Sequence, residues 1–188
     1  MKKKSIGTVA AVLALHAMML SGCKKEVAVA NDPLIVDVSV NKVINTPVGA
    51  VAYDSLDLNN DGLAECMLHL LNAGTNKGDV EFRYKSQQIE FAIEKLTPTV
   101  VCSIYKSGDI TPLSAASYRH AAYAAINNAG YLEGLKSGEG YLAFRFTTGT
   151  KYQYGWMRIV LNENFLQLNV TDYAYCLTPD KAIVVGTK

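Results

Sequence analysis

The segment 57–65 carries oxygen-bearing groups at a spacing that can bind a cation. It reads Asp-Leu-Asn-Asn-Asp-Gly-Leu-Ala-Glu. Side-chain oxygens at its first, third and fifth positions converge on one point if Gly62 makes a sharp turn with positive φ. The seventh position can add a backbone carbonyl and the ninth a carboxylate. A hard cation such as calcium needs six to eight oxygens at about 2.3–2.6 Å. The expected calcium ligands are Asp57, Asn59, Asp61, Leu63 and Glu65.

This acidic loop differs from a helix-flanked EF-hand, which requires a bidentate glutamate at position twelve, where this chain has Leu68. The loop is similar instead to the D-x-[DN]-x-D-G-x-x-[DE] calcium loops found between strands of secreted proteins. Three carboxylates correspond to an affinity of about 10⁻⁴ to 10⁻³ M. The alternative needs no metal, because Asn60-Asp61-Gly62 between apolar runs is also a good hairpin turn.

The first 23 residues form a second unit with its own chemistry. Three lysines precede a short apolar run, which ends in Leu20-Ser21-Gly22-Cys23. The run falls short of the ~20 apolar residues of a transmembrane helix, and its flanks are typical of a secretory signal. The tetrapeptide resembles the lipobox of bacterial lipoproteins. The alternative is an ordinary signal peptide whose cleavage region happens to contain a cysteine.

The lipobox resemblance implies that residues 1–22 are removed and that Cys23 becomes a lipidated and acylated first residue. Three buried acyl chains exceed the two signals that stable anchoring requires. Residues 24–33 then form a tether between Cys23 and the folded domain. No aspartate follows the cysteine, which favours the outer membrane, with the periplasmic and surface-facing sides both open. The membrane, reached through the lipid on Cys23, is therefore an expected partner.

Charge and composition exclude several classes of protein. The 188-residue chain is 49% hydrophobic and has a formal charge of +1. Removing residues 1–22 takes away three lysines and no acidic residue, so the remaining 166 residues carry −2. A nucleic-acid binder would need a basic excess. Collagenous, disordered and disulfide-dense classes do not fit the composition either.

The rest of the chain, 34–188, shows the period-two alternation of an all-β domain. Ile89, Phe91 and Ile93 alternate with polar residues, as do Phe82 and Tyr84. The pattern predicts a single antiparallel β-sandwich or jelly-roll-like domain with at most one short helix. The Ala-rich segment 113–129 is the helical candidate, expected to be a short helix or a crossing loop. The expected strands are 34–40, 50–56, 63–71, 79–86, 88–95, 99–105, 140–147, 152–161, 165–175 and 182–186.

Tyr152, Tyr154 and Trp156 share one face of an expected strand. Exposed, this aromatic stripe would serve as a platform for a carbohydrate or another ligand. Buried, it would be part of the core, as is common for a highly buried residue type such as tryptophan. Gly155, between them, allows another backbone to approach closely.

Several segments together resemble secreted β-sandwich proteins of Gram-negative bacteria, many of which carry a PEP-CTERM-type anchor. These segments are D-x-N-x-D-G within 53–65, a strand 140–146 ending in F-R-F, Y-G-W-x-R at 154–158, D-Y-A-Y at 172–175, and Gly186. The resemblance implies an extracellular or surface sandwich and no particular reaction. This chain departs from it by lacking a C-terminal sorting helix, which the lipid on Cys23 would replace.

No motif points to catalysis. The sequence contains no G-x-S-x-G, H-E-x-x-H or P-loop, and only His69 and His120 follow the signal segment. Cys66, Cys102 and Cys176 lie in apolar runs and allow at most one disulfide bridge. Ser55, in Asp-Ser-Leu, matches a loose pattern for periplasmic O-glycosylation.

The sequence therefore predicts a lipid-anchored envelope protein without catalytic activity. Its domain is expected to be stabilised by calcium and to act structurally or to bind a glycan or a protein. The alternative is a glycan-active hydrolase whose two carboxylates come together only in the fold.

Overall fold

A computed structural model describes residues 34–74, 77–85, 89–95, 99–128, 131–135, 138–162 and 165–187. The expected signal peptide, Cys23 and the tether lie outside these described residues. Residues 33–188 form one compact unit. Within the described part, no helix has the length and hydropathy needed to cross a membrane.

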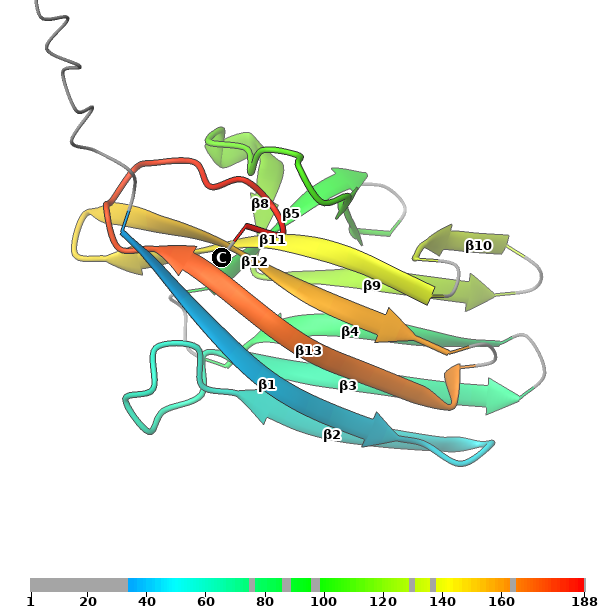
Figure 1. The fold of residues 1–188 in the computed structure, drawn as a ribbon. Helices are drawn as coiled ribbons and strands as arrows, with labels where there is room; N and C mark the ends of the chain where they lie inside the picture. The colour runs from blue at the N-terminus through cyan, green and yellow to red at the C-terminus, as the bar shows by residue number, and fades with distance from the viewer. Residues whose placement is uncertain are drawn as a thin grey trace, which may run out of the picture. The chain divides into compact units, whose positions relative to one another are not determined.

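The described chain confirms the all-β prediction. It contains thirteen strands and one three-residue 3-10 helix, η1 (Ala115–Ser117). The strands belong to one continuous sheet, in which β5 (Ile89–Lys95) is paired to strands of both halves. The sheet curls back on itself, so the fold is β-sandwich-like and nearly closed as a barrel (Figure 1).

The first half of the sheet runs outward from β5 in antiparallel pairs. Two short strands pair with β11 and β5 beside this path. The strands of this half, in spatial order, are β11 (Gly138–Thr148), β12 (Lys151–Leu161), β13 (Gln167–Cys176) and β1 (Ile35–Asn45), with β7 (Ile104–Tyr105) and β8 (Tyr118–Arg119) beside them.

The second half runs from β5 in the other direction. Its pairs are antiparallel except for a single parallel contact between β6 and β9, at Val101 and Tyr123. The strands of this half, in spatial order, are β6 (Val101–Cys102), β9 (Ala121–Asn128), β4 (Lys77–Tyr84), β3 (Cys66–Gly74) and β2 (Ala50–Leu56), with β10 (Tyr131–Gly134) on β9.

The alternation read from the sequence locates the core between the two halves. Ile89, Phe91 and Ile93 of β5 are buried, as predicted, and Phe82 of β4 packs against Phe91 with ring centroids 5.6 Å apart. Tyr84 was expected beside Phe82, but it is exposed because β4 ends at this residue.

The Ala-rich segment 113–129 folds differently from the expected helix or crossing loop. Its described part, 113–128, forms η1, β8 and all of β9. Ala122, Ala124 and Ala125 are buried in the main core. Small side chains let β9 fit between β4 and β6, and burial in the sheet overrides the helical preference of alanine. The expected strand 182–186 is also shorter than predicted, since it makes only an isolated bridge between Ile110 and Val184.

The two ends of the sheet, β1 and β2, are joined by a short turn but do not pair with each other. An ion pair crosses this seam, with Lys42 Nζ 2.9 Å from Asp54 Oδ1. A bulge between Ser39 and Lys42, with Asn41 at φ 49°, interrupts the edge strand β1. Bulges and charges of this kind protect exposed edges from pairing with other chains.

Gly155 of β12 confirms the close approach that its sequence context predicts. A Cβ here would stand 2.6 Å from the Ala174 carbonyl oxygen and 2.5 Å from the Phe144 ring. Replacing Gly155 by alanine should therefore lower the free energy of unfolding by about 1–3 kcal/mol through overpacking. Chemical denaturation followed by circular dichroism measures this change, and an unchanged midpoint would contradict the close approach.

Candidate functional site

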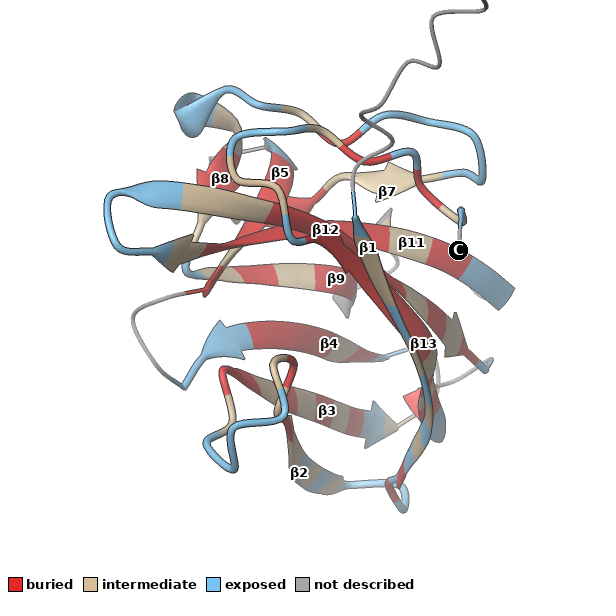
Figure 2. Ribbon diagram, turned by 60° about the vertical axis from the view of Figure 1, so that its left-hand side comes forward, coloured by how far each residue is buried: buried red, intermediate tan, exposed pale blue. Residues whose placement is uncertain are grey.

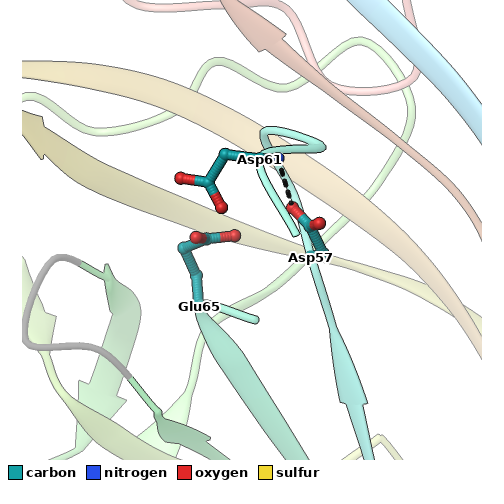
Figure 3. Close-up of side chains that lie close together, drawn as sticks. All are labelled: Asp57, Asp61 and Glu65. Carbon is teal, nitrogen blue, oxygen red and sulfur yellow. Dashed lines mark hydrogen bonds between the residues drawn. The ribbon is translucent and has the colours of Figure 1, made fainter. Parts of the chain in front are cut away.

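The acidic loop lies between β2 and β3 and brings three carboxylates together (Figure 3). Asp57, Asp61 and Glu65 each place one carboxylate oxygen within 4.8 Å of the others. They come from the start, middle and end of one nine-residue segment, so the turn of this segment alone determines their spacing. Three carboxylates at this separation can hold a metal ion.

Hydrogen bonds to backbone amides shape the turn. Asp57 Oδ2 accepts from the N–H of Gly62 at 2.8 Å, and Asp57 Oδ1 accepts from the N–H of Asp61 at 3.2 Å. Asp61 Oδ1 in turn accepts from the N–H of Leu63 at 2.8 Å. Gly62 has φ 89°, a conformation that glycine adopts without strain. The local sequence therefore suffices to bend the loop.

Glu65 is the buried member of the triad, with 3% of its surface exposed. Its Oε2 accepts from the N–H of Leu58 at 2.7 Å, and the Leu58 side chain is itself buried. Burial raises the pKa of the Glu65 carboxyl above its ordinary value of 4.5; the Leu58 N–H opposes this rise, and the charges of Asp57 and Asp61 add to it. A cation placed among the three carboxylates would relieve this repulsion.

Strand β13, which belongs to the other half of the sheet, also contacts the loop. The hydroxyl of Tyr173 donates to the backbone carbonyl of Asp57 at 3.2 Å. Burial raises the pKa of Tyr173 to about 12, with Tyr175 and Asp57 contributing further. At pH 7 the hydroxyl is therefore protonated and able to donate. The loop is in this way attached to both halves of the sheet.

Only three of the five predicted calcium ligands belong to the carboxylate cluster of the described residues. The structure gathers the carboxylates of Asp57, Asp61 and Glu65. The side chain of Asn59 bonds within the loop, accepting from the Asp61 N–H at 2.9 Å and donating to Asp61 Oδ2 at 3.1 Å. Leu63 has an exposed side chain, and its N–H bonds to Asp61.

The aromatic stripe of β12 is not an exposed ligand platform, which corrects one sequence-based hypothesis. Tyr154 and Trp156 are only 3% and 1% exposed. They form a second, smaller core with Ile183 and Val185 of the C-terminal segment. Tyr152 is half-buried at its margin. The stripe is covered because this face of the sheet is apolar and the segments 106–117 and 177–187 cross it (Figure 2).

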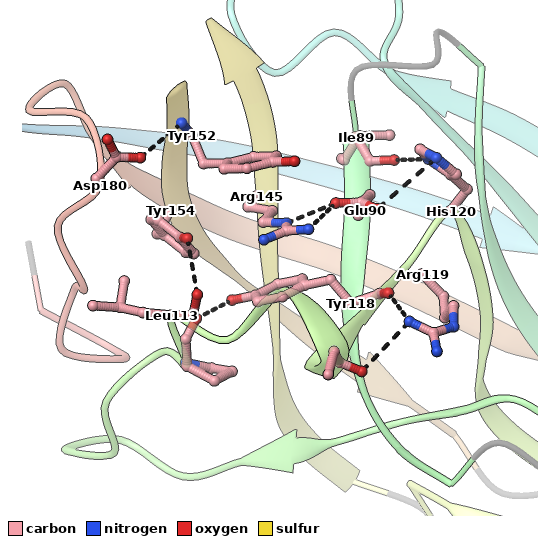
Figure 4. Close-up of polar contacts among 12 residues, drawn as sticks. Ile89, Glu90, Leu113, Tyr118, Arg119, His120, Arg145, Tyr152, Tyr154 and Asp180 are labelled. Atoms are coloured by element: carbon pink, nitrogen blue, oxygen red, sulfur yellow. Dashed lines mark hydrogen bonds and ion pairs between the residues drawn. The ribbon is translucent and has the colours of Figure 1, made fainter. Parts of the chain in front are cut away.

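A buried arginine occupies the margin of this second core (Figure 4). Arg145 Nε donates to Glu90 Oε2 at 2.6 Å, and its guanidinium lies 4.5 Å from the centroid of the Tyr118 ring and 3.9 Å from that of Tyr152. Such stacked and paired guanidinium groups stabilise cores. Glu90 is therefore the structural partner of Arg145.

A further polar cluster was not foreseen. His69 Nδ1 on β3 lies 3.1 Å from Asp79 Oδ1 and 3.8 Å from Glu81 Oε2 on β4, and Arg83 pairs with Glu81. Burial raises the pKa of Asp79, an effect that His69 opposes. Asp79, Glu81 and Arg83 occupy every second position of β4, which indicates that their side chains share one face of the sheet. Their meeting with His69 depends on the pairing register of β3 and β4, which no local signal reveals.

The remaining candidate residues have ordinary environments. Ser55 is half-buried in β2, and its N–H bonds to Asp54 Oδ1 at 2.7 Å. Cys66, Cys102 and Cys176 are buried free thiols. Burial raises the pKa of the Cys66 and Cys102 thiols, which makes both unreactive.

Comparison of the chain with protein-family models, with curated proteins and with solved structures finds no match. The fold and the acidic triad are thus the observations on which a functional proposal has to build.

The raised pKa of Glu65 predicts a pH dependence of stability in the absence of metal. The folded protein binds this proton more strongly than the unfolded chain. Glu65 therefore stabilises the fold below pH 4.5, and this contribution is lost as the pH rises through the folded-state pKa. Denaturant unfolding in chelator at several pH values should show this loss.

In the Glu65→Gln variant, the free energy of unfolding should fall less steeply with rising pH. The contribution of Asp79, whose pKa is also raised, should remain. Identical pH profiles for the variant and the parent protein would contradict the assignment.

Proposed function

We propose that this chain is a lipid-anchored protein of the bacterial cell envelope that acts as a structural or binding module and not as a catalyst. In this proposal Cys23 carries the lipid, residues 24–33 form the tether, and the β-sandwich-like domain is the functional part. The domain binds calcium at the acidic loop and presents its surface to a glycan or a protein.

The observation that carries the calcium proposal is the convergence of Asp57, Asp61 and Glu65 within 4.8 Å. Two further oxygens, those of the Asn59 side chain and the Leu63 carbonyl, belong to the same nine-residue segment. All are of the type that calcium prefers over transition metals. Because the Tyr173 hydroxyl also attaches this loop to β13, an ion here would stabilise both halves of the sheet.

The structural roles of the other charged groups support a non-catalytic module. Arg145 pairs with Glu90, and Arg158 Nε lies 2.6 Å from Asp172 Oδ1 across neighbouring strands. Both pairs lie on strand faces where they connect elements of the fold. The lipid proposal is supported by the three N-terminal lysines, the short apolar run and the tetrapeptide ending in Cys23.

Isothermal titration of the protein with calcium tests the metal proposal. We expect a single site with Kd of about 10⁻⁴ to 10⁻³ M. At about 10 mM calcium, such a site should raise the free energy of unfolding by roughly 1.4–2.7 kcal/mol. The Asp61→Ala variant should lose both the heat of binding and the stabilisation.

Asp109→Ala is a matched control for this titration. Asp109 is likewise an exposed loop residue whose carboxylate accepts from a backbone N–H, that of Lys106 at 2.7 Å. It lies outside the acidic loop, so its loss should leave calcium binding unchanged. No heat at millimolar calcium in the parent protein would refute the calcium proposal.

The anchor proposal is tested by the intact mass and the cellular fractionation of the expressed protein. We expect a chain beginning at Cys23 whose mass exceeds that of the polypeptide by a diacylglycerol and an acyl chain. The Cys23→Ala variant should lose this added mass and leave the membrane fraction. A mature protein of unmodified mass would contradict lipid attachment.

A further inference from the structure

One face of the domain, beside the first residue of the described chain, exposes large apolar side chains. They come from Leu34, the segment 106–117 and the segment that follows β13. We call this the apolar cover face. It consists of Leu34, Ile110, Leu113, Leu177 and Val184, whose exposed fractions are 65%, 63%, 50%, 37% and 39%.

Backbone contacts connect these segments. The N–H of Leu177 donates to the carbonyl of Leu34 at 2.8 Å, and Ile110 forms an antiparallel bridge with Val184. The neighbours of Val184, Ile183 and Val185, are buried in the second core. The side chain of Val184 therefore points away from the second core, toward solvent.

The same second core reaches the start of β1, because Ile35 packs against it. Figures 1 and 2 both show the cover segments at the side of the domain opposite β2. Single exposed leucines are common on soluble proteins. Here five large apolar side chains are exposed on segments that backbone hydrogen bonds connect, and a group of this kind indicates an interaction surface.

The chain that precedes Leu34 indicates what this face meets. Ten residues, 24–33, separate Leu34 from Cys23. A segment of ten residues can span at most about 35 Å. A lipid on Cys23 would thus keep Leu34, itself part of the face, close to the bilayer. Such tethering corresponds to an effective concentration in the millimolar range, at which weak contacts form.

The charges on the segments 106–117 and 177–187 permit contact between the apolar cover face and a bilayer. Lys106 and Lys181 are exposed there together with Asp109 and Asp180, so the segments carry no excess of negative charge to be repelled by anionic lipids. Leucine is among the residue types found at the boundary between headgroups and acyl chains, and binding there increases with the apolar area that is buried.

We propose that the apolar cover face rests on the lipid surface, with Leu34, Ile110 and Val184 inserted among the headgroups. This inference depends on the proposed lipid on Cys23. It orients the domain: the opposite side, with β2 and β3, faces away from the membrane and is the side accessible to partners.

The test uses the lipidated protein on vesicles of phosphatidylethanolamine and phosphatidylglycerol. A polarity-sensitive fluorophore is attached at Val184→Cys or, in a matched control, at Val51→Cys. Val51 is the same residue type, is 44% exposed and lies on β2. Labelling is selective because Cys66, Cys102 and Cys176 are buried and Cys23 carries the lipid.

The label at position 184 should show blue-shifted emission and several-fold less quenching by aqueous iodide than the label at position 51. Equal emission and equal quenching at the two positions, on protein that stays attached to the vesicles, would overturn the orientation and leave the anchor intact. Protein that washes off the vesicles and has an unmodified mass would overturn the anchor, and the orientation with it.

Discussion

The contact between the rings of Phe91 and Phe82 holds the two halves of the sheet together. Phe91 belongs to β5, the strand that both halves share, and it pairs with Phe144 of β11 on one side. Phe82 belongs to β4, in the middle of the other half, so this contact closes the sheet over its core. Since each of these side chains is fully buried, removing one would open a cavity that costs about 3–5 kcal/mol.

The attachment of the acidic loop to β13 depends on this closure. The loop connects β2 to β3, whereas the hydroxyl that bonds to it belongs to Tyr173 on β13. These strands come from different halves of the sheet and approach each other because the sheet curls. The burial of the Glu65 carboxyl, and its repulsion from Asp57 and Asp61, are energetic costs of the loop. Hydrogen bonds from backbone amides offset part of these costs, and a calcium ion would reduce the repulsion further. An ion at this position would thus stabilise the side of the sheet where its two end strands, β1 and β2, are not paired.

Local patterns in the sequence predicted the features that depend on neighbouring residues. The alternation of Ile89, Phe91 and Ile93 identified a core strand, and the spacing of Asp57, Asp61 and Glu65 identified a carboxylate cluster, because each is set within one segment. The pairs Arg145–Glu90 and His69–Asp79 were missed because they depend on strand register, which joins residues far apart in the chain.

Burial accounts for the other differences between prediction and structure. The parity of Tyr152, Tyr154 and Trp156 was correct, but parity does not show whether a sheet face is covered by another segment. The helical preference of residues 113–129 was likewise overridden by the fit of small alanine side chains between two strands. Both outcomes depend on tertiary contacts that the sequence pattern does not contain.

The most direct test of calcium binding by the acidic loop is a crystal structure of the protein grown with calcium, with the ion identified by its anomalous scattering. We expect one calcium ion at about 2.3–2.6 Å from carboxylate oxygens of Asp57, Asp61 and Glu65. A well-ordered loop at millimolar calcium that contains only water among these carboxylates would contradict it.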